Sequence, residues 1–237
     1  MRRLTSASAT AALTCLLVGA AATGCTDGGT TEKRSADQML DDANGAMRAL
    51  KSVTVDRVGN GTTSRLTTDL KNSCAFKTTS AKGAVLEQIR IDDTDYVRPN
   101  RAYVEAWNRR RADATHQTFP TDAARQKRWI KTPSSESRPS DGLTECTYPF
   151  ASFGKAAKGE PTKVNSTPAV PLVVTDKADK GGIFTFYVAT EGKPYILKVA
   201  YKGPTFGTST TTYSAFDEPL SVRPPADADV LDLSDIS

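Results

Sequence analysis

The chain has 237 residues, of which 24% are charged and 38% are hydrophobic, and its formal net charge is +4. This length and composition fit one largish domain or two small ones, and they exclude a collagen, a coiled coil and a multi-span membrane protein. A single histidine, His116, restricts any His-based triad or metal site to that residue, and four cysteines are too few for a disulfide-built miniprotein.

The N-terminus has the pattern of an export signal. Residues 1–24 contain no acidic side chain, begin with Arg2 and Arg3, and continue into an apolar run that is too short to span a membrane. Small residues directly precede Cys25, which resembles a bacterial lipobox. We therefore expect a lipoprotein signal peptide over residues 1–24 and a diacylglycerol and palmitate anchor on Cys25. The alternative is an ordinary secretory signal, cut beside Ala22.

Residues 25–34 are polar and contain two adjacent glycines, so they are expected to form a flexible tether after the anchor. Several acyl chains on Cys25 would hold the chain stably on the outer, extracytoplasmic face of the cell membrane. Without the two leader arginines, the excess of basic over acidic residues falls from four to two. This small excess gives no reason to expect a nucleic-acid partner.

The mature chain opens with a predicted helix. Ser35 and Gln38 fit a capping box. Apolar residues follow at helical spacing: Met39, Leu40, Ala43, Met47 and Leu50. This stripe is expected to pack on an apolar surface.

Period-two alternation begins near Ser52 and predicts a β-meander. Val53 and Val55 alternate with polar residues, and Asn60-Gly61 predicts a hairpin turn. Further strands are predicted at 62–70, 74–79, 84–91 and around Tyr96.

Residues 101–132 have a helical spacing of apolar residues, and two helices are predicted there, the second leading to Trp129-Ile130. The run Arg109-Arg110-Arg111 fits either a solvated helix face or a site for phosphate or anionic lipid headgroups. A polar loop at 132–142 and a short helix near Tyr148 are expected next. Strands are then predicted at 162–165, 169–175, 183–190, 195–201 and 208–216, followed by an extended tail.

The order of these elements predicts an α+β fold. A sheet of this many antiparallel strands must curl, so we expect a curved half-barrel with helices covering its concave face. We expect residues 35–237 to form a single domain, in a monomer.

Cys74 and Cys146 are the two thiols left if Cys15 leaves with the signal and Cys25 is acylated. In an exported protein they are expected to form a disulfide, and no Cys-x-x-Cys spacing indicates a redox role.

No motif in the sequence indicates catalysis. The chain has no Gly-x-Ser-x-Gly elbow, phosphate-binding Gly-rich loop or His-Glu-x-x-His motif. The acidic run Asp92-Asp93-Thr94-Asp95 fits either a turn or a calcium site, but it lacks the glycine and terminal glutamate of an EF-hand loop. We therefore expect a protein that is not an enzyme and has no cofactor or bound metal.

Several segments together resemble the lipid-anchored, LolA-like half-barrel lipoproteins of the LppX/LprAFG type. The segments are the Cys25 lipobox, the entry helix from Met39 to Val53, Gly83-Ala84-Val85-Leu86-Glu87, Asp95-Tyr96-Val97-Arg98, Lys127-Arg128-Trp129-Ile130-Lys131, the hairpin over 186–199, and the ending over 219–230. The resemblance implies a curved sheet over helices with an apolar cavity for acyl chains, and a role in moving lipids or lipoproteins across the envelope. The disulfide and the 132–142 loop depart from that pattern.

The expected function is therefore binding of a lipid or acyl chain in an apolar cavity, in the service of envelope lipid transport. The candidate cavity residues are Met39, Met47, Leu50, Phe184, Phe186, Leu197 and Val199. The same residues could instead pack together as a core. The alternative function is a structural or sensory lipoprotein that binds proteins through the exposed sheet face; no protein partner is identified.

Overall fold

The computed structural model describes residues 34–110, 128–136, 142–150, 152, 154–177, 179–204 and 207–232. Within these residues the chain forms two α-helices and a 13-stranded sheet. The helices are α1 (Ala36–Arg48) and α2 (Arg101–Arg110). The strands are β1 (Val53–Gly59), β2 (Thr62–Thr68), β3 (Ser73–Ser80), β4 (Val85–Ile91), β5 (Thr94–Pro99), β6 (Trp129–Pro133), β7 (Ala156–Lys158), β8 (Thr162–Val164), β9 (Thr167–Asp176), β10 (Gly182–Ala189), β11 (Ile196–Gly203), β12 (Gly207–Ser214) and β13 (Val230–Asp232).

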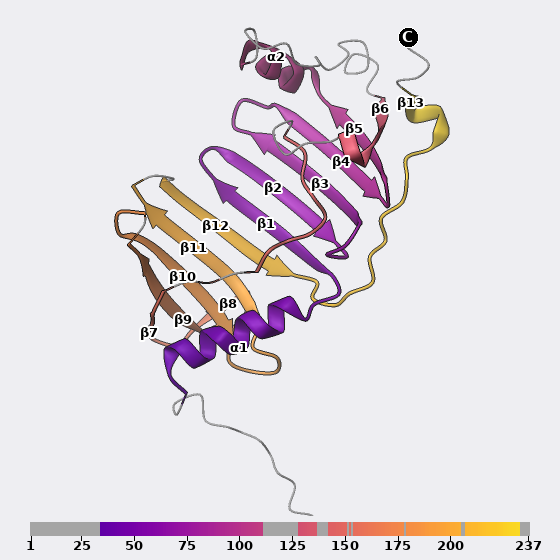
Figure 1. The fold of residues 1–237 in the computed structure, drawn as a ribbon. Helices are drawn as coiled ribbons and strands as arrows, with labels where there is room; N and C mark the ends of the chain where they lie inside the picture. Colours follow the sequence, from indigo (N-terminus) through magenta and orange to yellow (C-terminus); the bar gives the residue numbers. More distant parts are fainter. Residues whose placement is uncertain are drawn as a thin grey trace, which may run out of the picture. The chain divides into compact units, whose positions relative to one another are not determined.

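The sheet is open and almost entirely antiparallel (Figure 1). Its strand order is β13-β6-β5-β4-β3-β2-β1-β12-β11-β10-β9-β7, and β8 also pairs with β9. β13 pairs with β6 in parallel. The pairing of β1 with β12 joins the N-terminal meander to the C-terminal one, so two runs far apart in the chain share one surface. The predicted α+β class with a large antiparallel sheet is confirmed.

α1 begins where the sequence predicts. The Gln38 N–H donates to the Ser35 hydroxyl oxygen at 3.1 Å, and the Ser35 N–H donates to the Gln38 side chain at 3.0 Å, so the capping box is present. The helix buries Met39, Leu40, Ala43 and Met47. Burial of each large apolar side chain contributes about 1.5–3 kcal/mol.

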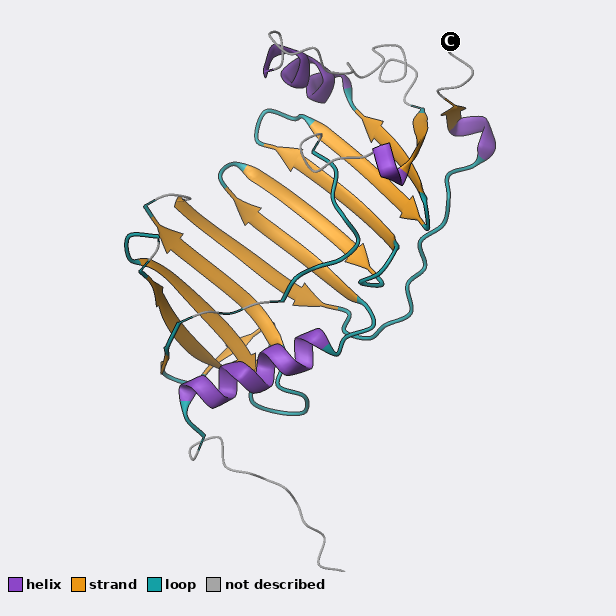
Figure 2. Cartoon of the chain, viewed as in Figure 1, coloured by secondary structure: helices purple, strands orange, loops and turns teal. Residues whose placement is uncertain are grey.

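Figure 2 shows how the two helices relate to the sheet. α1 lies across the ends of strands, and its buried side chains form one core cluster with residues of β1 and β9–β11. α2 packs at one end of β4, where Tyr103 and Trp107 join Leu86 and Val97 in a second cluster. α2 therefore adds little cover to the middle of the sheet, where the prediction had placed helices. The second helix predicted in this region, leading to Trp129, would fall on residues 111–127, which lie outside the described residues.

The tight turns of the first meander match the sequence. Asn60 and Gly61 both have positive φ, at 51° and 69°, as the predicted two-residue hairpin turn requires. Leu70, in the β2–β3 turn, and Asp92, in the β4–β5 turn, also have positive φ, at 61° and 51°. The β1–β2 turn places Val55 opposite Leu66, and the β2–β3 turn places Leu66 opposite Phe76, on one face of the sheet.

Two local predictions are wrong. Trp129 and Ile130 end no helix but form β6, where both are buried between neighbouring strands. This outcome suits residues with high β propensity. Residues 148–150 have no regular secondary structure, so the short helix expected near Tyr148 is absent. The predicted extended tail has no helix or strand over 219–226, makes a 3₁₀ turn at Asp227–Asp229 and ends in the edge strand β13.

Several predicted features lie outside the described residues: the leader, Cys25, His116, Arg111 and residues 137–141 of the predicted 132–142 loop, whose first residues belong to β6 and to a 3₁₀ turn at Ser134–Glu136. Among the residues that the structure does describe, no helix combines the length and hydrophobicity needed to cross a membrane.

Candidate ligand pocket

A chain segment that crosses one face of the sheet builds the candidate site. We call residues 143–150 the strap. In Figure 1 it runs from the region of β4 and β3 across β2 and β1 toward β12. The strap follows Gly142 and leads to β7.

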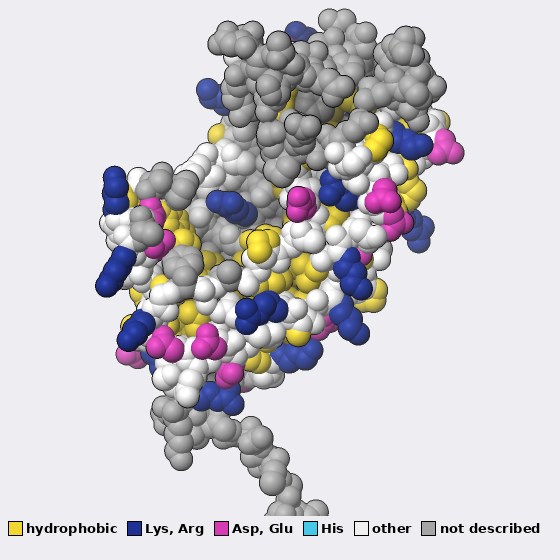
Figure 3. Space-filling model, viewed as in Figure 1, with side chains coloured by type: hydrophobic (Ala, Val, Ile, Leu, Met, Phe, Trp, Pro, Cys, Tyr) yellow, Lys and Arg dark blue, Asp and Glu magenta, His cyan; other side chains and the backbone are white. Residues whose placement is uncertain are grey.

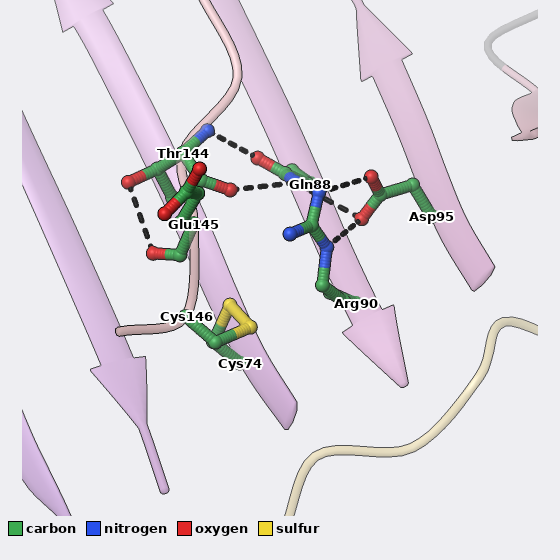
Figure 4. A network of polar contacts seen from close by, with 7 residues as sticks. All are labelled: Cys74, Gln88, Arg90, Asp95, Thr144, Glu145 and Cys146. Carbon is green, nitrogen blue, oxygen red and sulfur yellow. Dashed lines mark hydrogen bonds and ion pairs between the residues drawn. A yellow bond between two sulfur atoms is a disulfide. The ribbon is translucent and has the colours of Figure 1, made fainter. Parts of the chain in front are cut away.

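A disulfide and several hydrogen bonds hold the first half of the strap against the sheet (Figure 4). Cys146 is linked to Cys74 of β3, with a Cα–Cα distance of 5.3 Å, which confirms the predicted disulfide. The Thr68 hydroxyl of β2 donates to the Cys146 carbonyl. The Thr144 N–H donates to the Gln88 side-chain oxygen at 2.9 Å, and the Gln88 amide donates back to the Thr144 carbonyl at 3.1 Å. The strap is thus bonded to three successive strands, β2, β3 and β4.

A buried ion pair supports Gln88. The Asp95 side chain has no solvent exposure, and it accepts hydrogen bonds from Arg90 at 2.6 and 2.8 Å and from Gln88 at 3.0 Å. The hydrogen bonds to Asp95 raise the pKa of the Arg90 guanidinium above its ordinary value. Asp95 therefore belongs to a structural network, and the carboxylate of Asp92 likewise accepts a hydrogen bond from Asn72 at 2.7 Å. Within the described residues, no group of three or more potential metal ligands is present.

The second half of the strap carries aromatic side chains onto the sheet. Tyr148 and Phe150 lie with ring centroids 5.2 Å apart, and each lies within about 6 Å of the Tyr213 ring, at 6.0 and 5.9 Å. The Tyr148 and Tyr213 hydroxyl oxygens are 3.5 Å apart. Burial raises the pKa of the Tyr213 hydroxyl far above its ordinary value, so this group stays neutral.

Between the strap and the sheet is a pocket with a volume of about 280 Å³. The strap contributes Tyr148, Pro149 and Phe150. β10, β11 and β12 contribute the apolar and aromatic side chains Phe184, Phe186, Ile196, Val199, Tyr201 and Tyr213. Phe184 lies between Phe186 and Tyr201, with ring centroids 6.3 and 4.6 Å away.

A polar edge borders the apolar wall. It is formed by Arg57 of β1 and by Ser209 and Thr211 of β12. Arg57 lies directly opposite Thr211 in the sheet register, and Gly59 lies opposite Ser209. Figure 3 shows this face of the molecule, with hydrophobic side chains over β10–β12 and Lys or Arg side chains among them. The site thus combines an apolar interior with one cationic edge.

The structure separates the predicted cavity residues into three groups. Phe184, Phe186 and Val199 line the pocket. Met39, Met47 and Leu50 are buried in the core between α1 and the sheet. Leu197 lies in a cluster on the opposite face of the sheet, with Val164, Ala169 and Ala189.

The sequence did not predict that Arg57 or the aromatic residues of the strap would line the pocket. Tyr148 and Phe150 are far from β12 in the chain, and no local pattern predicts that they meet Tyr213. The position of Arg57 could have been predicted from the sequence. Arg57 continues the alternation of Val53 and Val55, so it lies on the same face of β1 as those two buried valines.

Among known proteins, this chain is similar to others in its structure but not detectably in its sequence. No family model and no curated protein sequence matches the chain. LprF from Mycobacterium bovis is 12% identical, with a TM-score of 0.48, and the match covers 81% of this chain and 97% of that one. LppX, a lipoprotein of Mycobacterium tuberculosis, is 14% identical, with a TM-score of 0.39 and coverage of 78% and 96%.

This chain is similar to LprF and LppX. Both are proteins of the type that the sequence resembles, as predicted. MucB of Pseudomonas aeruginosa, solved in complex with MucA, is also similar, at 18% identity and a TM-score of 0.37 over 81% of this chain and 59% of that one. At these scores the similarities indicate nothing about a ligand of this chain.

Proposed function

We propose that this chain is an extracytoplasmic lipoprotein that binds the hydrocarbon part of a lipid in the pocket beneath the strap. The observation that carries the proposal is the aromatic and aliphatic wall of that pocket, which is closed on one side by Tyr148 and Phe150. Ligand pockets are typically concave and mainly apolar, with a few polar groups at fixed positions. A hydrocarbon chain is the ligand that matches such a wall.

The size of the pocket limits its ligand. A dry apolar cavity of about 150 Å³ accommodates one benzene ring in a well-studied case. By that proportion, the pocket of about 280 Å³ has room for about ten carbon atoms. It accommodates one acyl chain, or the end of a longer one, rather than several chains side by side.

The proposed location follows from the N-terminal pattern. An anchor on Cys25 would keep the pocket close to a membrane surface, and residues 26–34 would leave it free to approach lipids. The Cys74–Cys146 disulfide fits an oxidising compartment outside the cytoplasm. We propose that the protein acts as a monomeric, non-enzymatic carrier of envelope lipids.

The test fills the pocket without removing a core side chain. Thr211 lines the pocket, whereas its neighbour Thr212 is on the opposite face of β12, so Thr211→Trp and Thr212→Trp form a matched pair. Each would be made in the full chain carrying Cys25→Ala. Dodecanol, an uncharged amphiphile, would be titrated by calorimetry below its solubility limit. Co-purifying lipid would be detected by native mass spectrometry.

We expect Thr211→Trp to weaken dodecanol binding at least about tenfold and to lose co-purified lipid, because the indole occupies the ligand volume. We expect Thr212→Trp to bind like the parent. If the parent binds neither dodecanol nor lipid, the carrier function is wrong and the protein-binding alternative takes its place. Equal binding by both variants would show that hydrocarbon binds elsewhere on the chain.

A further inference from the structure

The charges on the two faces of the N-terminal meander are arranged differently. One face carries a row of five charged residues on neighbouring strands, Asp56, Arg65, Lys77, Glu87 and Arg98. These pair with one another: Arg65 with Asp56 at 3.6 Å, and Lys77 and Arg98 with Glu87 at 3.2 and 2.7 Å. Every basic side chain of this row has an acidic partner.

Arg57 is an exposed residue on the other face, and its neighbours in the sheet register are uncharged. Its register partners are Ser64 of β2 and Thr211 of β12. Within the described residues Arg57 forms no ion pair, unlike Arg90 on the same face, which is paired with Asp95. The pocket also has an acidic neighbour: Asp179, in the turn before β10, accepts a hydrogen bond from the hydroxyl of Tyr201, whose strand β11 is separated from β1 by β12.

Because Arg57 lies at the polar edge of the pocket, its charge is placed where a bound ligand could contact it. Arg57 lines the pocket together with Ser209 and Thr211 and with the aromatic wall, and it pairs with Thr211 in the sheet register. A guanidinium offers five N–H donors and no acceptor, and its best partners are carboxylate and phosphate oxygens. The two hydroxyls can donate to the same anion.

We propose that Arg57, with Ser209 and Thr211, binds the anionic group of a single-chain amphiphile whose hydrocarbon chain occupies the pocket. This inference rests on the proposed function and specifies the class of ligand: an alkyl chain of about ten carbons within the pocket, ending in a carboxylate or a phosphate. The charge of Arg57 and the apolar wall would then together determine which ligands bind tightly. Uncharged lipids lose the contact with Arg57, and small anions lose the contact with the wall.

The experiment compares ligands that share a chain and differ in charge. Laurate, dodecyl phosphate, dodecanol and inorganic phosphate would be titrated into the full chain carrying Cys25→Ala, with the three amphiphiles kept below their critical micelle or solubility limits. The variants are Arg57→Gln, which removes the charge, and Arg57→Lys, which restores it. Arg65→Gln is the matched control, since Arg65 is on the opposite face of the adjacent strand.

We expect the parent to bind laurate or dodecyl phosphate at least about tenfold more tightly than dodecanol, because hydrogen bonds to charged groups are the stronger ones. Arg57→Gln should remove this preference, so that laurate and dodecyl phosphate bind no more tightly than dodecanol. Arg57→Lys should restore part of the preference, and Arg65→Gln should retain all of it. Added salt should weaken the binding of the anions alone.

The outcomes separate this inference from the proposed function. If the parent binds dodecanol as tightly as laurate and dodecyl phosphate, or if Arg57→Gln changes nothing, the role of Arg57 is wrong while the hydrocarbon pocket stands. If inorganic phosphate binds as tightly as dodecyl phosphate, the site recognises a free anion and the amphiphile is wrong. If none of the three amphiphiles binds, the proposed function itself is wrong.

Discussion

At the scale of single residues, the buried polar side chains of Gln88 and Asp95 hold the strap against the sheet. Asp95 is fully buried, and three hydrogen bonds from Arg90 and Gln88 satisfy its carboxylate. Gln88 in turn pairs with Thr144 through two hydrogen bonds. The Asp95 carboxylate therefore positions the Gln88 side chain, and Gln88 fixes the point at which the strap contacts β4.

We expect Asp95→Asn to lower the free energy of unfolding by about 3 kcal/mol. The variant keeps the shape of the side chain but leaves the Arg90 charge without its counterion in a mostly buried site. The measurement is urea unfolding followed by circular dichroism. Glu105→Gln, in the exposed pair of Arg101 and Glu105, is the control and should change stability by less than about 0.5 kcal/mol. Equal small effects of both variants would contradict a structural role for the Asp95 network.

At the scale of elements, the strap is ordered by covalent and aromatic contacts rather than by secondary structure. It has neither helical nor strand hydrogen bonding, yet Cys146 is 1% exposed, and the Tyr148 and Phe150 rings pack on Tyr213. The disulfide closes a loop with a sequence separation of 72 residues. Because that loop spans β4, β5, α2 and β6, the crosslink joins the first meander to the wall of the pocket.

We expect the double variant Cys74→Ala, Cys146→Ala to be about 4 kcal/mol less stable than the oxidised parent, as the chain-entropy model gives for a loop of this length. Freed from β3, the strap should hold its aromatic rings less firmly over the pocket, so dodecanol binding should weaken as well. Both are measured on the full chain carrying Cys25→Ala, by urea unfolding and by calorimetry. The parent treated with a reductant should match the double variant. Unchanged stability with weakened binding would mean that the crosslink serves the pocket alone.

At the scale of the whole molecule, one sheet connects the two ends of the described chain. β1 pairs with β12, and β13 pairs with β6, so residues near the start and the end of the described part both contribute to the central surface and its edge. The pocket is on that shared surface, beside the β1–β12 pair. Its walls come from both meanders and from the strap, and neither meander alone could form it.

The predicted anchor is a property of the whole molecule and has its own test. We expect Cys25→Ala to move the protein from the membrane fraction to the soluble fraction of cells, since the acyl chains on Cys25 would supply the membrane affinity. The measurement is fractionation followed by immunoblotting, with Cys15→Ala as the control that should remain in the membrane. Membrane retention of Cys25→Ala would contradict the lipoprotein assignment.

Local chemistry was enough to predict much of the fold. The capping box at Ser35, the alternation of Val53 and Val55, and the Asn60-Gly61 turn each encode structure within a few residues, and each appears as predicted. The strand boundaries agree within two or three residues for the same reason. Local chemistry failed at Trp129, where helical spacing was outweighed by pairing with β5 and β13.

The sequence by itself determined helix α1, the strands other than β6, β7 and β13, several turns and, through the count of available thiols, the pairing of Cys74 with Cys146. Only the tertiary structure decided that Tyr148 and Phe150 meet Tyr213, that Leu197 faces away from Phe186, and that Arg57 borders the pocket without an acidic partner. The physical reason is the distance along the chain between the residues that interact. Caps, turns and alternation depend on neighbours in the chain, whereas the pocket depends on contacts between segments that are many tens of residues apart.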